Sequence, residues 1–138
     1  MKERLGRLTA ASERKWGTMT ASQAVAHCAI GMEWAVGDKT PPRMLLGRLL
    51  GRAVKPMALK DDAPMKKNSP TSPELVVRDG PDFEAERGRL CGLLDRFAAG
   101  GAEGCTGHPH TFFGKMTPEE WAVLEYKHVD HHLRQFGV

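Results

Sequence analysis

The segment from Thr117 to Gln135 constrains the fold more than any other part of the chain, because a helical pattern runs through its whole length. Thr117 can cap the first turn, Pro118 suits the first helical position, and Glu120 completes a capping box. Residues three, four and seven positions apart then form one face, which consists of Trp121, Leu124, His128, His131, His132 and Gln135. This face is apolar at its beginning and rich in imidazole at its end, so a helix that buries it also carries histidines into the core.

His128 and His132 lie four positions apart on this face, so their side chains project side by side from the helix. Two ligands of one metal ion require that arrangement. A random His-x-x-x-His pair is more often a pair of surface or core histidines. Here the pair belongs to the face that is expected to point into the core, which favours a metal site.

Two other long segments follow helical patterns. In residues 20–37, Thr20 and Gln23 form a second potential capping box, and apolar side chains surround nearly the whole helix. Such a helix is typical of the central member of a bundle. A further helix is predicted to begin at residues 79–82 and to end at Gly100-Gly101. Its predicted inner face consists of Phe83, Leu90, Leu94 and Phe97.

Two shorter helical pieces are also predicted. Residues 2–15 contain Leu5 and Leu8 among charged residues, which indicates a short amphipathic helix. The other piece begins at Pro41-Pro42 and extends to about Val54. Its predicted inward-facing residues are Leu45, Leu46, Leu49 and Leu50. No part of the chain has a convincing strand pattern.

Residues 55–81 contain prolines at a density that excludes a helix of useful length: Pro56, Pro64, Pro70, Pro73 and Pro81. This segment is therefore predicted to be an extended crossover. Four helices with one long crossover predict an all-α fold, namely a four-helix bundle with an extra short helix. A chain of 138 residues suits a single domain, here residues 1–138, with a core that needs no disulfides.

The composition is that of an ordinary globular protein, with 41% hydrophobic and 27% charged residues. The formal charge of +3 is too small to indicate a nucleic-acid partner. Three cysteines without a Cys-x-x-Cys pair are typical of a reduced protein. No apolar run is long enough to span a membrane, and the first residues lack an apolar signal segment. We therefore expect a cytoplasmic protein without a membrane partner.

A third metal ligand is expected from His27, because it lies in the middle of the least polar helix. An unpaired imidazole buried there would cost about 1–3 kcal/mol, and coordination of a metal removes that cost. The alternative is a neutral core histidine that is bonded to a backbone carbonyl. Together with His128 and His132, His27 favours the metal site.

Three neutral histidines leave coordination positions open, which is typical of a catalytic rather than a structural centre. Zinc is the most common metal of such sites, and nickel or iron(II) accepts the same nitrogens. The chemistry would then follow from Lewis acidity, which lowers the pKa of a bound water or thiol.

Several other polar residues are weaker candidates. His131 could be a second-shell donor, a proton carrier or a packing residue, and Gln135 could orient a ligand or make a bond at the helix end. Both are taken as candidate catalytic residues. Asp130 and Glu125 are expected to face water. The remaining two histidines, His108 and His110, either reach over the site from a glycine-rich loop or are solvated.

The chain resembles the DinB/YfiT-like superfamily of helical-bundle metalloproteins, and more narrowly a DinB-like branch of uncharacterised domains. The similar parts are residues 16–20 (WGTMT) with His27, residues 110–121 (HTFFGKMTPEEW) and residues 128–137 (HVDHHLRQFG). The superfamily pattern is one histidine on an early helix and His-x-x-x-His followed shortly by Gln on the last helix. The resemblance therefore implies ligand roles for His27, His128 and His132.

The chain departs from this pattern in two places. Members of the branch tend to have His-Pro before an aromatic-Gly step, with which either His108-Pro109 or His110-Thr111 could align. The wider motif has Arg-Gly before its Gln, where this chain has Leu133-Arg134. No role is carried over from these two segments.

The resemblance implies a range of functions. Characterised relatives include metal-dependent transferases and isomerases that use low-molecular-weight thiols such as bacillithiol, mycothiol or glutathione, and others are described as hydrolases. We expect transfer or addition of such a thiol to a small electrophile. Basic residues near the crossover could receive the carboxylates of the thiol, or could simply form a solvated face. They are Arg43, Arg48, Arg52, Lys55 and Lys60.

Two alternatives remain open. One is a metal-dependent hydrolase of a small substrate, although no inward-facing carboxylate is evident as its general base. The other is a bundle that binds metal or a partner without catalysis and that forms a homodimer. Phe112 and Phe113 would then serve as a lid or a dimer contact.

Overall fold

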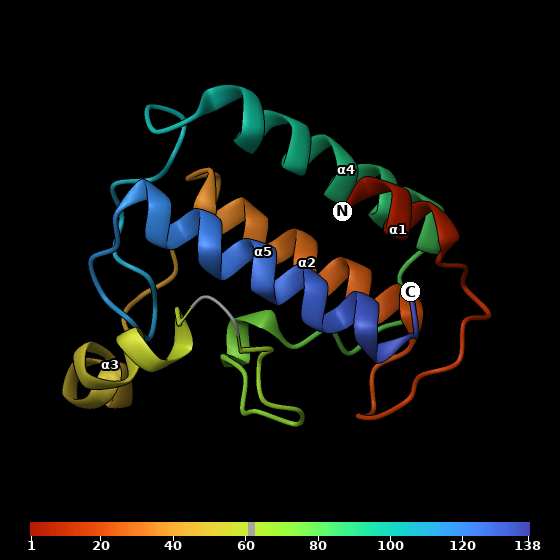
Figure 1. Ribbon diagram of the computed structural model, residues 1–138, viewed down its shortest axis with the longest axis horizontal. Coiled ribbons are helices and arrows are strands. Elements are labelled where there is room, and N and C mark those ends of the chain that lie inside the picture. The colour runs from red at the N-terminus through yellow and green to blue at the C-terminus, as the bar shows by residue number, and fades with distance from the viewer. Residues whose placement is uncertain (61–62) are drawn as a thin grey trace.

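The computed structural model describes residues 1–60 and 63–138, and its secondary structure is helical (Figure 1). The elements, in chain order, are α1 (Lys2–Arg7), α2 (Ala21–Ala35), α3 (Leu45–Ala58), the short 3-10 helix η1 (Pro73–Leu75), α4 (Phe83–Gly100) and α5 (Pro118–Gln135). Within the described residues, β pairing is limited to one isolated bridge between His110 and Gly114. The prediction of an all-α fold is confirmed.

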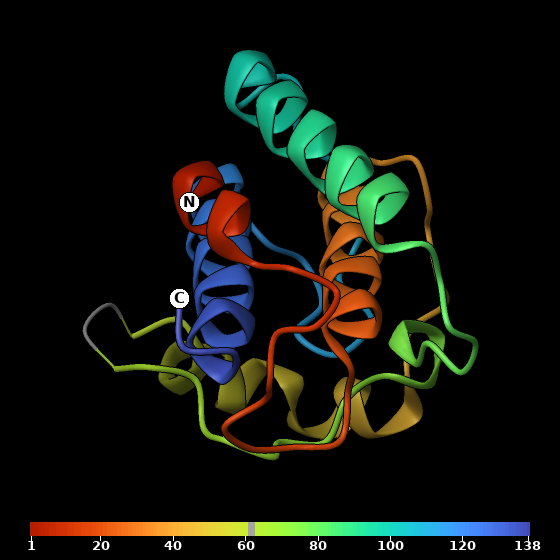
Figure 2. The same cartoon turned by 90° about the vertical axis from the view of Figure 1, so that its right-hand side faces the viewer.

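Helix α2 lies at the centre of the core, where it packs against both α4 and α5 (Figure 2). Its side chains are buried around most of the helix, as the apolar pattern of residues 20–37 predicts. The main apolar cluster combines α1, α2, α4 and α5 and includes Leu5, Met32, Leu90, Val129 and Leu133. A second cluster joins the other ends of α2 and α5 through Trp34, Trp121 and Leu124, so apolar contacts fix the two helices relative to each other along their length.

The two predicted capping boxes are both present, and they set where α2 and α5 begin. The Thr20 hydroxyl accepts from the Gln23 amide at 3.2 Å, and the Gln23 side chain accepts from the Thr20 amide at 3.0 Å. Thr117 and Glu120 make the same pair of bonds at 3.2 and 2.9 Å. Each box satisfies two amide groups that a helix terminus otherwise leaves unpaired.

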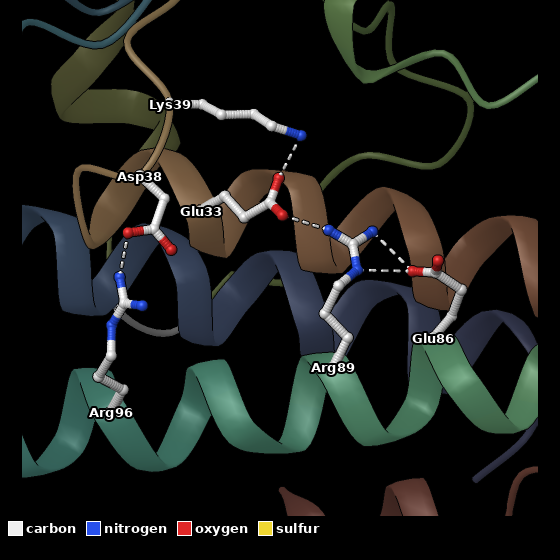
Figure 3. Close-up of polar contacts among 6 residues, drawn as sticks. All are labelled: Glu33, Asp38, Lys39, Glu86, Arg89 and Arg96. Atoms are coloured by element: carbon white, nitrogen blue, oxygen red, sulfur yellow. Dashed lines mark hydrogen bonds and ion pairs between the residues drawn. The ribbon is translucent and has the colours of Figure 1, made fainter.

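Ion pairs connect α2 and the turn after it to α4 (Figure 3). Arg89 of α4 pairs with Glu33 of α2 and with Glu86 on its own helix, while Arg96 pairs with Asp38. Exposed pairs of this kind contribute little free energy, so the main effect of this network is to orient α4. The buried residues of α4 are Phe83, Leu90 and Leu93, with Leu94 and Phe97 partly buried against the core.

Helix α3 contradicts one prediction, because the leucines expected to face the core are exposed: Leu45, Leu46, Leu49 and Leu50. Gly47 and Gly51 are instead the buried residues of α3. A Cβ atom added at Gly51 would lie 1.9 Å from the carbonyl oxygen of Phe112. The loop around Phe112 therefore approaches α3 so closely that a glycine face fits and a leucine face does not.

Two predicted boundaries also need correction. Helix α1 ends at Arg7, well before residue 15. Helix α3 continues through Pro56 to Ala58, although the crossover was expected from residue 55 onwards. The last turn of α3 closes because the Leu59 amide donates to the Lys55 carbonyl at 3.0 Å. Residues 61 and 62 of the predicted crossover lie outside the described residues. No helix in the described parts of the chain is both long enough and apolar enough to cross a membrane.

Candidate metal centre

Helices α2 and α5 bring three imidazoles together. His27 comes from the middle of α2, and His128 and His132 come from successive turns of α5. One nitrogen of each ring lies within 4.8 Å of the corresponding nitrogens of the other two. The Nε2 atoms of His27 and His128 are 2.7 Å apart, and the ring centroids of His27 and His132 are 4.8 Å apart. The three rings therefore surround one point between the two helices.

His27 is oriented by the crossover. Its Nδ1 lies 2.8 Å from the carbonyl oxygen of Leu75, a residue of η1. Because a carbonyl oxygen only accepts hydrogen bonds, the Nδ1 of His27 carries the proton and its Nε2 keeps a free lone pair. That lone pair is directed at the other two histidines. The crossover thus contributes to the site by selecting the tautomer of His27.

His132 is oriented in the same way by Gln135. The amide nitrogen of Gln135 donates to the carbonyl oxygen of Trp16 at 2.8 Å, so the amide oxygen is the atom that faces His132. This oxygen accepts from the Nδ1 of His132 at 2.8 Å, which leaves the lone pair of the His132 Nε2 available to a metal ion. Gly17 has φ = 75°, and a Cβ atom there would lie 2.6 Å from the Gln135 amide nitrogen. A glycine after Trp16 lets the chain pass this close to Gln135.

His128 has a carboxylate behind it. An oxygen of Glu125 lies 3.8 Å from the Nδ1 of His128, and this oxygen is buried without a hydrogen-bond partner. Glu125 was expected to face water, and its exposure of 4% corrects that expectation. Gly31 of α2 makes room for the pair, because a Cβ atom there would lie 3.1 Å from the His128 ring. All three Nδ1 atoms therefore face an acceptor, on the side of each ring away from the centre.

Burial keeps the imidazoles of His27 and His132 neutral. Burial lowers the pKa of His27 to about 3, and the positive charge of a protonated His128 would lower it further. Burial also lowers the pKa of His132 well below its usual value, and His128 and His27 add to that effect. A neutral imidazole is the form that binds a metal ion. The donor set fits a divalent cation such as Zn²⁺, because three neutral nitrogens with oriented rings are typical ligands of that ion.

An open pocket of about 280 Å³ leads from the surface to the three histidines. The turn at Trp16 and the crossover around Met65 and Lys66 form its walls. His131 also lines the pocket, and its ring meets that of Trp16 edge-on at 5.8 Å between centroids. Burial lowers the pKa of His131, so this group is neutral at neutral pH and can accept a proton. The pocket gives a small molecule access to the ligand nitrogens.

The two loop histidines, His108 and His110, do not line this pocket. The Nδ1 of His110 accepts from the amides of Phe112 and Phe113 at 3.1 Å, and its ring packs 5.3 Å from that of Trp121. Burial lowers the pKa of His110 to about 4. The ring of His108 lies 3.0 Å from the carbonyl oxygen of Pro109. Neither His108 nor His110 is among the residues that line the pocket.

The basic residues expected to receive a thiol cofactor are also outside the pocket: Arg43, Arg48, Arg52, Lys55 and Lys60. Of the described residues that line the pocket, Lys66 carries a positive charge. Asp130 was also expected to face water, but the structure buries it, with only 7% of its surface exposed. It pairs with Arg4 of α1 and with Arg134 one turn later on α5, both at 2.7 Å, so its role is to hold α1 on α5.

Sequence reasoning missed Glu125 and the carbonyl of Leu75. Glu125 precedes His128 by three positions, so both lie on the same side of α5, and this spacing could have indicated the contact. No local signal could have indicated Leu75, because it is separated from His27 by 48 positions.

The family model described as "Protein of unknown function (DUF1569)" matches residues 2–137, and the chain belongs to that family. No curated protein and no solved structure matches the chain significantly. The family description assigns no activity, so any function has to be argued from the site itself.

Proposed function

We propose that this member of the family is a metal-dependent enzyme in which His27, His128 and His132 bind one divalent cation at the base of the pocket. The observation that carries the proposal is the orientation of the rings. The Nδ1 of His27 faces the carbonyl oxygen of Leu75, and the Nδ1 of His132 faces the amide oxygen of Gln135, both at 2.8 Å. The Nε2 atoms of His27 and His128 face each other at 2.7 Å, within hydrogen-bond distance. Core histidines that only pack do not require outer acceptors that turn their rings toward one point. Zinc is the proposed metal, with nickel or iron(II) as alternatives.

The proposed fold is a DinB-like four-helix bundle with a long crossover. In its favour, α2 packs against both α4 and α5, and η1, in the connection from α3 to α4, lies against the middle of α2, where Leu75 contacts His27. A bundle core is a usual place for a metal site that is built from facing helices. The outward-facing leucines of α3 distinguish this chain from a simple bundle in which all helices bury their apolar sides.

The proposed reaction is the transfer of a low-molecular-weight thiol to a small electrophile. A divalent cation supplies Lewis acidity there, which favours the thiolate over the thiol at neutral pH. Among the described residues that line the pocket there is no carboxylate to repel an anion. Lys66 adds a positive charge to the wall. These features favour an anionic nucleophile over a cationic substrate.

His131 is the proposed proton acceptor in this reaction. It lines the pocket next to His132, with 5.1 Å between the ring centroids, and its lowered pKa keeps it neutral at neutral pH. The sulfur forms a new bond to the electrophilic carbon, the S–H proton moves to an imidazole nitrogen of His131, and the leaving group departs with its electron pair. Trp16 packs against His131 and limits the access of water to it.

The metal site is tested by titrating metal-free protein with Zn²⁺ and Co²⁺ by calorimetry and visible absorption. We expect one ion per chain and a tetrahedral Co²⁺ spectrum. His128→Ala should weaken binding by more than the roughly 10- to 100-fold loss that follows removal of an outer partner. His108→Ala is the matched control and should bind like the wild type, because His108 lies outside the pocket. Equal affinity in His128→Ala would overturn the proposal.

The reaction is tested on the metal-loaded protein with glutathione or bacillithiol and an aryl halide. We expect a sulfur-to-cobalt absorption band when the thiol is added, and thioether formation that His128→Ala abolishes. Hydrolysis of esters or amides that depends on His128, without thioether formation, would favour the hydrolase instead. A protein that binds metal but shows neither activity would be a non-catalytic metal-binding bundle.

A further inference from the structure

The outer face of α3 is apolar and exposed. Leu45, Leu49 and Met57 each expose 77% of their surface, and Leu46, Leu50 and Val54 expose between 36% and 53%. These residues form one continuous side of the helix, opposite the buried glycines Gly47 and Gly51. Single exposed apolar residues are common in soluble proteins, but a helix side made of six of them indicates a binding surface.

Within residues 39–60, every charged side chain is basic. No aspartate or glutamate occurs between residues 39 and 60, whereas six lysines and arginines do. Two of these are paired, Lys39 with Glu33 and Lys55 with Glu120. Arg48 and Arg52 are exposed, and neither takes part in an ion pair within the described residues. Both follow the leucines by three or four positions, so they border the apolar face.

The shape of this surface is a ridge. Helix α3 lies at the periphery of the molecule in both views (Figures 1 and 2). The pocket described above does not include any α3 residue. A peptide helix usually binds in a groove between elements, and α3 has no such groove. A deformable surface, into which the exposed leucines can insert, suits α3 better than a peptide helix does.

We propose that α3 seats the protein on an anionic membrane surface. The helix lies parallel to the bilayer, with its leucines and Met57 among the upper parts of the lipid chains. Arg48 and Arg52 extend from the border of the apolar face to the anionic headgroups. This proposal departs from the expectation of no membrane partner. That expectation considered only spanning segments and a signal segment, whereas an interfacial helix needs an amphipathic side and not a long apolar run.

Charge favours this occupant over a second copy of the chain. In a symmetric dimer through α3, the same patch would meet itself, and Arg48 and Arg52 of both copies would approach each other. The helix offers no acidic residue to offset that repulsion. An anionic lipid surface supplies the complementary charge for every basic residue at once.

The test is flotation of the full-length protein with vesicles of phosphatidylcholine alone or with phosphatidylglycerol added. We expect binding to the anionic vesicles that weakens as salt is raised. Leu45→Gln with Leu49→Gln should lower the affinity about tenfold or more, since both side chains are fully outside the core. Arg48→Gln with Arg52→Gln should cause a similar loss on anionic vesicles only.

Two matched controls separate this surface from general stickiness and from the metal site. Val76→Gln with Tyr126→Gln removes exposed apolar side chains outside α3 and should leave binding unchanged. His128→Ala should also bind vesicles like the wild type, whether or not the metal proposal holds.

Two results would overturn the membrane proposal. One is the absence of wild-type binding to anionic vesicles, or binding that Leu45→Gln with Leu49→Gln leaves intact. The other is a dimer in sedimentation that the same double variant dissociates without any vesicle binding, which would make a second copy the occupant.

Discussion

Glu125 is the residue whose role follows most directly from its surroundings. It is 4% exposed, and the oxygen without a hydrogen-bond partner lies 3.8 Å from the Nδ1 of His128. A buried carboxylate without a partner is costly, so the contact with His128 is its evident compensation. Because the carboxylate lies behind the ring, Glu125 is a positioning residue and does not touch a substrate.

We predict that Glu125→Gln weakens Zn²⁺ binding by about 10- to 100-fold, because a carboxylate behind a ligating histidine fixes the ring and raises its basicity. The amide keeps the shape and loses the charge. Glu119→Gln is the matched control, since Glu119 is an exposed glutamate on the same helix. Calorimetric titration of both variants measures the difference. Equal affinities would mean that the Glu125 carboxylate does not act on His128.

At the scale of single elements, α3 illustrates how a backbone contact can override an apolar pattern. Its leucines have the spacing of a core-facing helix, and yet its glycines face the protein. A Cβ atom at Gly47 would lie 2.6 Å from the Phe112 backbone, and one at Gly51 would lie closer still. The backbone of the loop cannot move aside as a flexible side chain could, so the contact requires glycine at both positions.

We predict that Gly51→Ala destabilises the protein by about 1–3 kcal/mol, in the range of an overpacked core. Gly92→Ala in α4 is the opposite case, because nothing lies within 4 Å of its Cβ position. That change should stabilise by about 0.5–1 kcal/mol, as alanine does in a helix interior. Denaturant unfolding measures both values. Hydrogen exchange should be faster along α3 in Gly51→Ala alone, and unchanged exchange there would contradict the proposed close packing.

At the scale of the whole molecule, the three histidines connect distant parts of the chain. His27 and His128 are 101 positions apart, and the crossover residue Leu75, which is 48 positions from His27, bonds to it. A metal ion at this point would bind the native arrangement and not the unfolded chain, in which no such site exists.

We therefore predict that Zn²⁺ at about 100 times its Kd stabilises the native state by about 2.7 kcal/mol. For a domain of this size, that corresponds to a rise in Tm on the order of 10 °C. A chelator should reverse the rise. His27→Ala should lose it and His108→Ala should retain it in the same calorimetric scan. An equal rise in His27→Ala would place the bound metal elsewhere.

The local features of this protein could be predicted from the sequence alone. The capping boxes at Thr20 and Thr117, the burial of α2 and the shared face of His128 and His132 depend on residues at most four positions apart. Helix geometry determines such relations before any tertiary contact forms. The all-α fold class followed from them, and the three histidines named as ligands are brought together, although their binding of a metal stays a prediction.

Tertiary structure alone decided the features that depend on distant neighbours. The backbone of Phe112 packs closely against the glycines of α3, so the leucines of α3 face outward. Glu125, which was expected to face water, is buried where α5 packs against α2. The partner of His27 is a carbonyl, which every residue has, so no side-chain pattern could have indicated it. The spacing of apolar residues predicts which side chains share a helix face. Which face is buried depends on the segments that pack against the helix, as the backbone around Phe112 does against α3.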